Sequence, residues 1–173
     1  ILSRERTNEN YTDILYSHLE EYERMSKMVS DMLLLAQTEH GLIKPNKDEV
    51  AVNQEIKDLM EYFEVLADDK NIKLTLIGPP VVIVCDKTML RQALSNLISN
   101  AIRYSPKDDK IVIATKNTAD AISISIINHG EVISKEHLGR LFDRFYRTDF
   151  SRKRDGQGAG LGLTIAKSII KIN

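Results

Sequence analysis

Four glycines near the end of this 173-residue chain, at positions 156, 158, 160 and 162, form the pattern that points most directly to chemistry. An apolar run at helical spacing, residues 161–170, begins among them. Glycine lets a backbone adopt positive φ and approach a ligand closely. A helix N-terminus offers unpaired N–H groups and a partial positive charge. The pattern therefore predicts a phosphate-binding turn, with a loop that only caps a core helix as the alternative.

Three familiar phosphate-binding loops do not fit this run. A P-loop has Gly-Lys-Ser/Thr at the helix start, where this chain has Gly162-Leu163-Thr164. A Rossmann loop follows a buried strand, whereas residues 148–155 are too polar for one. The glycine loop of a protein kinase is followed by Val and a Val-Ala-Ile-Lys strand, which this chain lacks.

Two asparagines lie one turn apart in segment 88–104, which is predicted to be an amphipathic helix. Each Asn costs helix stability, about 0.5 kcal/mol relative to Ala, so Asn96 and Asn100 call for an explanation. Carboxamide oxygens suit a Mg²⁺ ion that keeps most of its waters and bridges phosphates. Arg103, one turn further on, is placed to meet phosphate oxygens. A plain solvated helix face is the alternative.

Two further segments are candidates for the same site. Asn128-His129-Gly130 comes just past a predicted strand end. The span 140–156 carries six basic and three acidic residues, a net charge of +3, directly before the glycines. We interpret this span as a lid over polyphosphate, anchored by Phe142 and Phe145. The alternative is a solvated loop with two core aromatics.

The elements that must position these residues follow from periodicity. Residues 8–40 predict one long helix with an apolar stripe, which needs a partner along most of its length. An antiparallel hairpin that dimerises into a bundle would provide one, and packing on its own globular domain is the alternative. Gly41 is the expected stop, and 41–48 is a turn or linker that divides the chain into 1–41 and 42–173.

The second part alternates helices with pairs of strands. Asn53 is expected to cap a helix, strands 72–77 and 81–85 are joined by Gly78-Pro79-Pro80, and Asp86 caps the 88–104 helix. Strands 111–115 and 121–127 follow, and the glycine run opens the last helix. This order predicts an α/β two-layer sandwich with helices on one face of a mixed or antiparallel sheet.

Composition limits the classes of protein and of site that the chain could represent. The net charge of −1 argues against general nucleic-acid binding. The single cysteine, Cys85, lies in an apolar run that predicts a buried strand, and it fits a reducing compartment. Its spacing from the histidines predicts no transition-metal site. No apolar run is long enough to span a membrane. Because the chain starts at Ile1 and ends directly after a helix, we expect a fragment of a larger protein.

Taken in order, these segments resemble the catalytic and ATP-binding domain of sensor histidine kinases, which has the Bergerat (GHKL) fold. Residues 90–106 are similar to the N box of that family, 141–147 to its F box and 156–163 to its G2 box. Residues 25–36 are similar to the second helix of the dimerisation and phosphotransfer hairpin. The amino-acid sequence of residues 140–152 resembles that of the heavy-metal-resistance branch, the copper and silver sensors.

The resemblance implies ATP and Mg²⁺ as cofactors and assigns roles to individual residues. Asn100, helped by Asn96, would hold Mg²⁺ on the ATP phosphates. The other implied nucleotide contacts are Arg103 and Arg147 to phosphate, Tyr104 near adenine, Asn128 and Gly130 in the adenine loop, and Gly158, Gly160, Leu161 and Gly162 around the phosphates. ATP-hydrolysing relatives carry a Glu where this chain has Asn96, which cannot act as a base. Phosphate transfer to a protein is therefore expected, with an ATPase or serine-kinase switch and a nucleotide-independent dimerisation module as alternatives.

Three departures from the family pattern matter. The G1 box usually reads Asp-x-Gly-x-Gly, whereas this chain has Asn128, Gly130 and then Val132. No His-acid phosphoacceptor motif is present, since His18 lies in Tyr-Ser-His-Leu-Glu, so autophosphorylation is not expected. The strands that normally close the sheet after Ile170 are missing. The implied partners are a response regulator and a second copy through the hairpin helix. The parent protein is expected at the cytoplasmic face of a bacterial inner membrane, with this fragment soluble.

Overall fold

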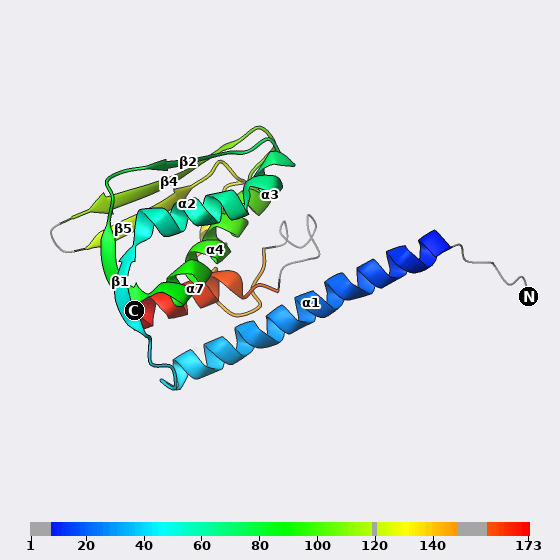
Figure 1. The fold of residues 1–173 in the computed structure, drawn as a ribbon, viewed down its shortest axis with the longest axis horizontal. Helices are drawn as coiled ribbons and strands as arrows, with labels where there is room; N and C mark the ends of the chain where they lie inside the picture. Colours follow the sequence, from blue (N-terminus) through cyan, green and yellow to red (C-terminus); the bar gives the residue numbers. More distant parts are fainter. Residues whose placement is uncertain (1–7, 119–120, 149–158) are drawn as a thin grey trace, which may run out of the picture.

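The computed structural model describes residues 8–118, 121–148 and 159–173. One long helix, α1 (Asn8–Glu39), leads into the α/β part, as the apolar stripe predicted. In Figure 1 it runs diagonally beneath the other elements, and the chain turns back from its end into β1. The α/β part contains β1 (Lys47–Ala51), α2 (Val52–Tyr62), α3 (Glu64–Asp68), β2 (Lys73–Ile77), β3 (Val82–Asp86), α4 (Lys87–Tyr104), β4 (Lys110–Asn117), β5 (Ile122–Ile127), α5 (Lys135–Leu138) and α7 (Gly162–Ile172).

The main sheet has the strand order β2-β4-β5. Strand β2 runs parallel to β4, and β4 runs antiparallel to β5. Helices α2 and α4 cover one face of this sheet, and α7 lies beyond α4 on the side away from the sheet (Figure 1). The predicted mixed sheet with helices on one face is thus confirmed, with α7 as an added layer.

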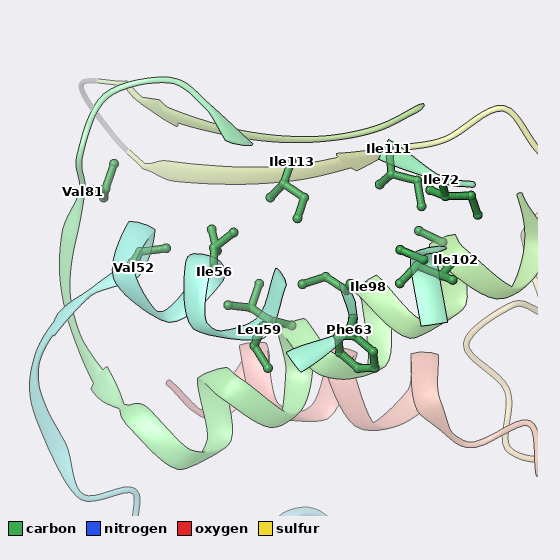
Figure 2. Close-up of a cluster of buried hydrophobic side chains, with 13 residues drawn as sticks. Val52, Ile56, Leu59, Phe63, Ile72, Val81, Ile98, Ile102, Ile111 and Ile113 are labelled. Atoms are coloured by element: carbon green, nitrogen blue, oxygen red, sulfur yellow. The ribbon is translucent and has the colours of Figure 1, made fainter. Parts of the chain in front are cut away.

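A hydrophobic core fills the space between the sheet and its helices. Figure 2 shows Ile98 and Ile102 of α4 pointing toward Ile111 and Ile113 of β4, and all four are at most 4% exposed. Helix α2 adds Ile56 on the same side. Residues alternate in direction along strand β5, so Ile122, Ile124 and Ile126 face this core while the two serines and Ile127 face solvent. The core therefore anchors one side of α4 and leaves its polar side for other use.

A second core cluster lies between α4, α7 and the end of α1. It joins Met89 and Ala93 of α4 to Ile165 of α7, with Leu161 just before α7 and Leu35 from α1. The last turns of α1 therefore pack on the α/β part. Further toward the N-terminus the apolar stripe stays exposed, as at Tyr11, Leu15, Leu19, Tyr22, Met25 and Val29. Packing on its own globular domain, one of the two predicted alternatives, thus accounts for the last turns of α1, and the dimerising bundle stays a prediction.

The expected pairing of strands 72–77 and 81–85 is wrong. Strand β2 pairs with β4, and β3 pairs with β1, which lies partly inside the segment assigned to a linker. Nor is β3 buried on both faces, because Val82 and Val84 are 58% and 62% exposed while Cys85 is buried. Side chains of a strand point alternately to the two faces of its sheet, and only one face of this two-stranded sheet is covered. Buried and exposed residues therefore alternate along β3.

The predicted cap at Asn53 is also wrong, because α2 begins at Val52 and its N-cap is Ala51, two residues before Asn53. Asn53 instead spans the chain reversal before β3. Its Oδ1 accepts a hydrogen bond from the Val81 N–H at 2.9 Å, and its Nδ2 donates to the Pro79 carbonyl at 3.1 Å. The predicted cap of α4 is confirmed, since Asp86 Oδ1 accepts from the Met89 N–H at 3.0 Å.

Candidate nucleotide-binding cleft

A cleft of about 940 Å³ lies beside the polar side of α4. Its other walls are the loop after β5, the α5 region, the start of α7 and one face of α1. The predicted site residues that line it are Asn96, Asn100, Arg103, Tyr104, Asn128, Gly130, Arg147, Gly160, Leu161 and Gly162. Gly158 and the second part of the charged span, residues 149–156, lie outside the described residues. The structure thus brings together every predicted site residue that it describes.

Helix α4 is fixed at both ends, which sets the direction of its polar residues. Asp86 caps its start. At its end the Lys70 ammonium donates to the carbonyls of Ile102 at 2.8 Å and Arg103 at 2.7 Å. A cation at a helix C-terminus is favourable for both the free carbonyls and the helix dipole. With its apolar side held in the core, the helix presents Asn96 and Asn100 to the cleft.

The amide of Asn96 lies against the glycine turn. A Cβ added to Gly162 would be 3.6 Å from both Cγ and Oδ1 of Asn96. The Asn96 Nδ2 is buried and has no hydrogen-bond partner among the described residues. A buried polar atom without a partner is rare and costs free energy. In a wall of a cleft, such a donor indicates a place where a ligand oxygen would accept a hydrogen bond.

Gly160 occupies a position that only glycine fits. Its φ is +72°, and an added Cβ would lie 2.8 Å from the carbonyl carbon of Phe145. The Phe145 N–H donates to the Gly160 carbonyl at 3.0 Å, and the Thr164 hydroxyl donates to the Phe142 carbonyl at 2.9 Å. Residues 141–147, here called the aromatic segment, are therefore bonded directly to the glycine turn. Phe142 and Phe145 are about half exposed, so neither is a core aromatic.

The loop after β5 also depends on a close backbone approach. A Cβ on Gly130 would lie 2.9 Å from the Tyr104 carbonyl oxygen and 3.2 Å from Asn128 Nδ2. His129, which lies between Asn128 and Gly130 in the sequence, is bonded to Asp109 through its N–H at 3.1 Å and its Nδ1 at 2.9 Å. Burial alone would raise the pKa of Asp109, but the hydrogen bonds from His129 and from the Lys110 N–H lower it to about 2.

The contribution of α1 to this cleft was not predicted from the sequence. Arg24, Lys27, Met28 and Asp31 all line it. Asp31 is only 7% exposed, and burial raises its pKa against the opposing effect of the Lys27 ammonium, which lies 4.0 Å away. The burial of a charged residue in a helix that is otherwise mostly exposed marks Asp31 as part of the cleft. The periodicity of the sequence does not show which residues surround it.

His137 and Tyr146 were missed as well. Both line the cleft, and His137 Nδ1 lies 2.6 Å from the Tyr146 hydroxyl. The Arg140 guanidinium stacks on the same ring, 4.3 Å from its centre. These contacts tie α5 to the aromatic segment, and they join residues that are too far apart in sequence for spacing to suggest them.

The metal chemistry of the cleft is restricted by its donor set. Among the described residues, no three His, Cys, Asp or Glu side chains are grouped as a metal site. Helix α4 contributes a pair of neutral amides, Asn96 and Asn100, which fits Mg²⁺ bound mainly through phosphate and water oxygens. In the same described part of the chain, no helix combines the length and the apolar character that crossing a membrane requires.

Comparison with known proteins identifies relatives along nearly the whole chain. The sensor histidine kinase CusS of Escherichia coli K12 is 45% identical over 169 residues, which cover 98% of this chain and 35% of CusS. The probable sensor protein PcoS of Escherichia coli is 46% identical, with 98% and 36% covered. The chain thus spans about a third of the length of the curated relatives it matches. The predicted resemblance to the heavy-metal branch of sensor histidine kinases is confirmed.

The fold and a family model agree with these relatives. The structure of the Acinetobacter baumannii histidine kinase AdeS superimposes with a TM-score of 0.74 at 24% identity, covering 98% of this chain and 76% of that one. Residues 85–173, which include α4, the loop after β5 and the glycine turn, match a single family model. On this match the chain belongs to the histidine kinase-, DNA gyrase B- and HSP90-like ATPase family.

Proposed function

We propose that the chain binds Mg²⁺-ATP in the cleft beside α4 and acts as the catalytic part of a sensor histidine kinase, transferring the γ-phosphate to a histidine outside this chain. The observation that carries the proposal is the contact between Asn96 and Gly162. It places a buried amide nitrogen without a partner among the described residues beside a helix N-terminus. Both groups suit a phosphate oxygen.

Each part of the nucleotide has a wall of the cleft to match it. Asn100, together with Asn96, would hold Mg²⁺, which shields the charge of the phosphates when bound. Gly158, Gly160, Leu161 and Gly162 would surround the phosphates with backbone N–H groups, and Arg103 and Arg147 would add positive charge. Tyr104, Asn128 and Gly130 would receive the adenine at the other end.

The reaction asks for positioning and charge neutralisation more than for acid–base chemistry. The Asn96 amide has no basic lone pair, so it can orient a phosphate or a water but cannot remove a proton from that water. The walls of the cleft would exclude bulk water and hold the terminal phosphate for attack by an imidazole nitrogen. These properties favour transfer to a protein over hydrolysis.

The proposed function also suggests a phosphate-accepting histidine and the protein partners. None of the four histidines in this chain is directly followed by an acidic residue. We therefore place the acceptor histidine on the first helix of a hairpin whose second helix is α1, with 1–41 and 42–173 as the two parts. A response regulator would then take the phosphate. The parent protein would be anchored in a bacterial inner membrane and dimerise through the hairpin.

Binding of a fluorescent ATP analogue with and without Mg²⁺ tests the proposal. We expect Mg²⁺-dependent binding that Asn100→Ala reduces at least tenfold. Asn117→Ala, at the exposed end of β4, is the matched control and should bind like the wild type. Absence of Mg²⁺-dependent binding by the wild type would overturn the proposal. Steady phosphate release from the chain alone would favour an ATPase instead.

A further inference from the structure

One buried carboxylate outside the cleft connects two of its walls. Asp109 lies in the turn between α4 and β4, and its side chain is only 6% exposed. Its Oδ2 accepts the His129 N–H at 3.1 Å, and its Oδ1 lies 2.9 Å from the His129 ring nitrogen. Asp109 does not line the cleft itself. Asp109 could therefore affect a bound ligand only indirectly, by positioning the residues next to His129.

The neighbours of His129 on both sides belong to the wall of the cleft, as do residues 131–134 of the same loop. Asn128 and Gly130 flank His129, and both line the cleft. The β4–β5 pairing sets Val112 opposite Ile127, and the same register continued past the strand ends sets Asp109 opposite Gly130. A hydrogen bond to the His129 backbone at this point fixes where the chain leaves β5. It thereby fixes the direction of both neighbours.

The loop has little freedom once this bond is made. Gly130 passes so close to the Tyr104 carbonyl that a Cβ would lie 2.9 Å from its oxygen. The Asn128 side chain folds over the same glycine, with Nδ2 3.2 Å from that added Cβ. The end of α4, the loop and the carboxylate thus form one closely fitted unit at this end of the cleft.

A purely stabilising role explains this arrangement poorly. The His129 side chain is 74% exposed, so the bond to it buries little apolar surface. Taking a carboxylate out of water is costly, and the surrounding donors must offset that cost. The adjacent Asp108 shows the ordinary solution for such a turn. It is exposed and accepts a hydrogen bond from Asn71 at 2.6 Å, away from the cleft.

We propose that Asp109 is a positioning residue, which holds the Asn128–Gly130 loop against the end of α4 and thereby sets the affinity for the nucleoside half of the nucleotide. The inference rests on the proposed function, because the loop is assigned to the adenine end of ATP. The phosphate end of the cleft, at Gly160 and Gly162, does not depend on Asp109.

The test compares Asp109→Asn with Asp108→Asn in an ATP titration of the full chain in the presence of Mg²⁺. Backbone amide shifts in ¹⁵N-resolved spectra report the two ends of the cleft separately. For Asp109→Asn we expect about tenfold weaker ATP binding, since a hydrogen bond to a charged group is lost. At saturating ATP, the shift of Gly162 should remain and the shift of Gly130 should be lost. Asp108→Asn should match the wild type in both respects.

Asp109→Glu provides a second variant if Asp109→Asn fails to fold. It keeps the charge but moves the carboxylate by one methylene, so it should show the same selective loss at Gly130. Unchanged affinity, or equal loss at Gly130 and Gly162, would overturn the inference while wild-type binding stands. If the wild type itself does not bind ATP, the proposed function fails and this inference fails with it.

Discussion

The positions around the glycine turn differ in how strictly the backbone geometry requires glycine. Gly160 combines a φ of +72° with a backbone atom 2.8 Å from where a Cβ would be. Gly162 has ordinary contact distances, 3.6 Å to the Asn96 side chain. Glycine is thus required by geometry at Gly160, whereas at Gly162 its main effect is to leave room beside Asn96.

This contrast predicts different outcomes for two alanine variants. Gly160→Ala should lower the free energy of unfolding by about 2 kcal/mol, because a side chain at this φ is strained and also clashes. Gly162→Ala should change it by less than about 1 kcal/mol, since alanine is tolerated in a helix. Urea unfolding of the two variants measures both values. Equal destabilisation would contradict the account of the turn.

The carboxylate of Asp109 predicts a pH-dependent contribution to stability. Its pKa of about 2 in the folded chain lies below the ordinary value of 3.8. A lowered pKa stabilises the fold while the group is ionised, by about 2 kcal/mol at neutral pH. The free energy of unfolding of the wild type should therefore exceed that of Asp109→Asn above pH 5. The difference should shrink as the pH falls from about 4 to 2.

Urea titrations of both proteins at several pH values measure this difference. Asp108→Asn is the control, and its difference from the wild type should stay nearly constant over the same range. A constant gap between wild type and Asp109→Asn down to pH 2 would show that the ionised carboxylate is not what stabilises the loop.

At the scale of elements, α4 has separate structural and chemical sides. Ile98 is fully buried in the core, whereas Asn100 faces the cleft. Ile98→Ala should cost about 3 kcal/mol through the cavity it leaves. Asn100→Ala should leave stability within about 0.5 kcal/mol, because alanine is the better helix former. ATP binding should respond in the opposite order, strongly to Asn100→Ala and weakly to Ile98→Ala below its unfolding temperature.

Two measurements on the same pair of variants separate the sides. Thermal unfolding without nucleotide gives the structural effect, and analogue binding at low temperature gives the chemical one. If Asn100→Ala destabilises the chain as much as Ile98→Ala does, its side chain is part of the packing and the assignment to the cleft is wrong.

Local patterns predicted the elements of the site well. The spacing of Asn96 and Asn100 placed both on the polar side of one helix, and the glycines before α7 indicated its start. Asp86 was recognised as a cap because a capping side chain bonds only to its own helix. These features depend on residues within one or two turns of each other, which is the range that periodicity and capping rules describe.

Features that depend on distant residues were not predictable in the same way. Strand β1 carries a single buried residue, Val50, so it has no alternation to recognise, and its partner β3 begins 35 positions after β1 begins. Asn53 has the right chemistry for a cap but bonds to Val81 instead. Asp31 became a cleft residue only through the docking of α1 on the α/β part.

At the scale of the whole molecule, the C-terminal end of α1 contacts segments that border the cleft. Leu35 is buried against Leu161 and Ile165, at the start of the helix that follows the glycines. Glu39 forms an ion pair with Arg144 of the aromatic segment, and the hydrogen bond from Arg144 lowers the pKa of Glu39. The long helix is thus in contact with both segments that we assign to the phosphate end of the nucleotide.

The rest of α1 leaves its apolar stripe without cover. Leu15, Leu19 and Tyr22 are 68%, 54% and 65% exposed. A continuous stripe of this kind on a helix of 32 residues is typical of a helix that packs against another helix. A second copy of the chain, as proposed above, would cover it.

This predicts association that depends on concentration and on the stripe. Sedimentation equilibrium should give a mass approaching twice 19.7 kDa as concentration rises. The double variant Leu15→Glu with Leu19→Glu should stay monomeric, because charges in a helix interface lose their hydration. Val65→Glu, at an exposed apolar residue of α3, should associate like the wild type. ATP binding should be the same in all three, since none of these residues lines the cleft. A double variant that still dimerises would place the contact between copies elsewhere than on α1.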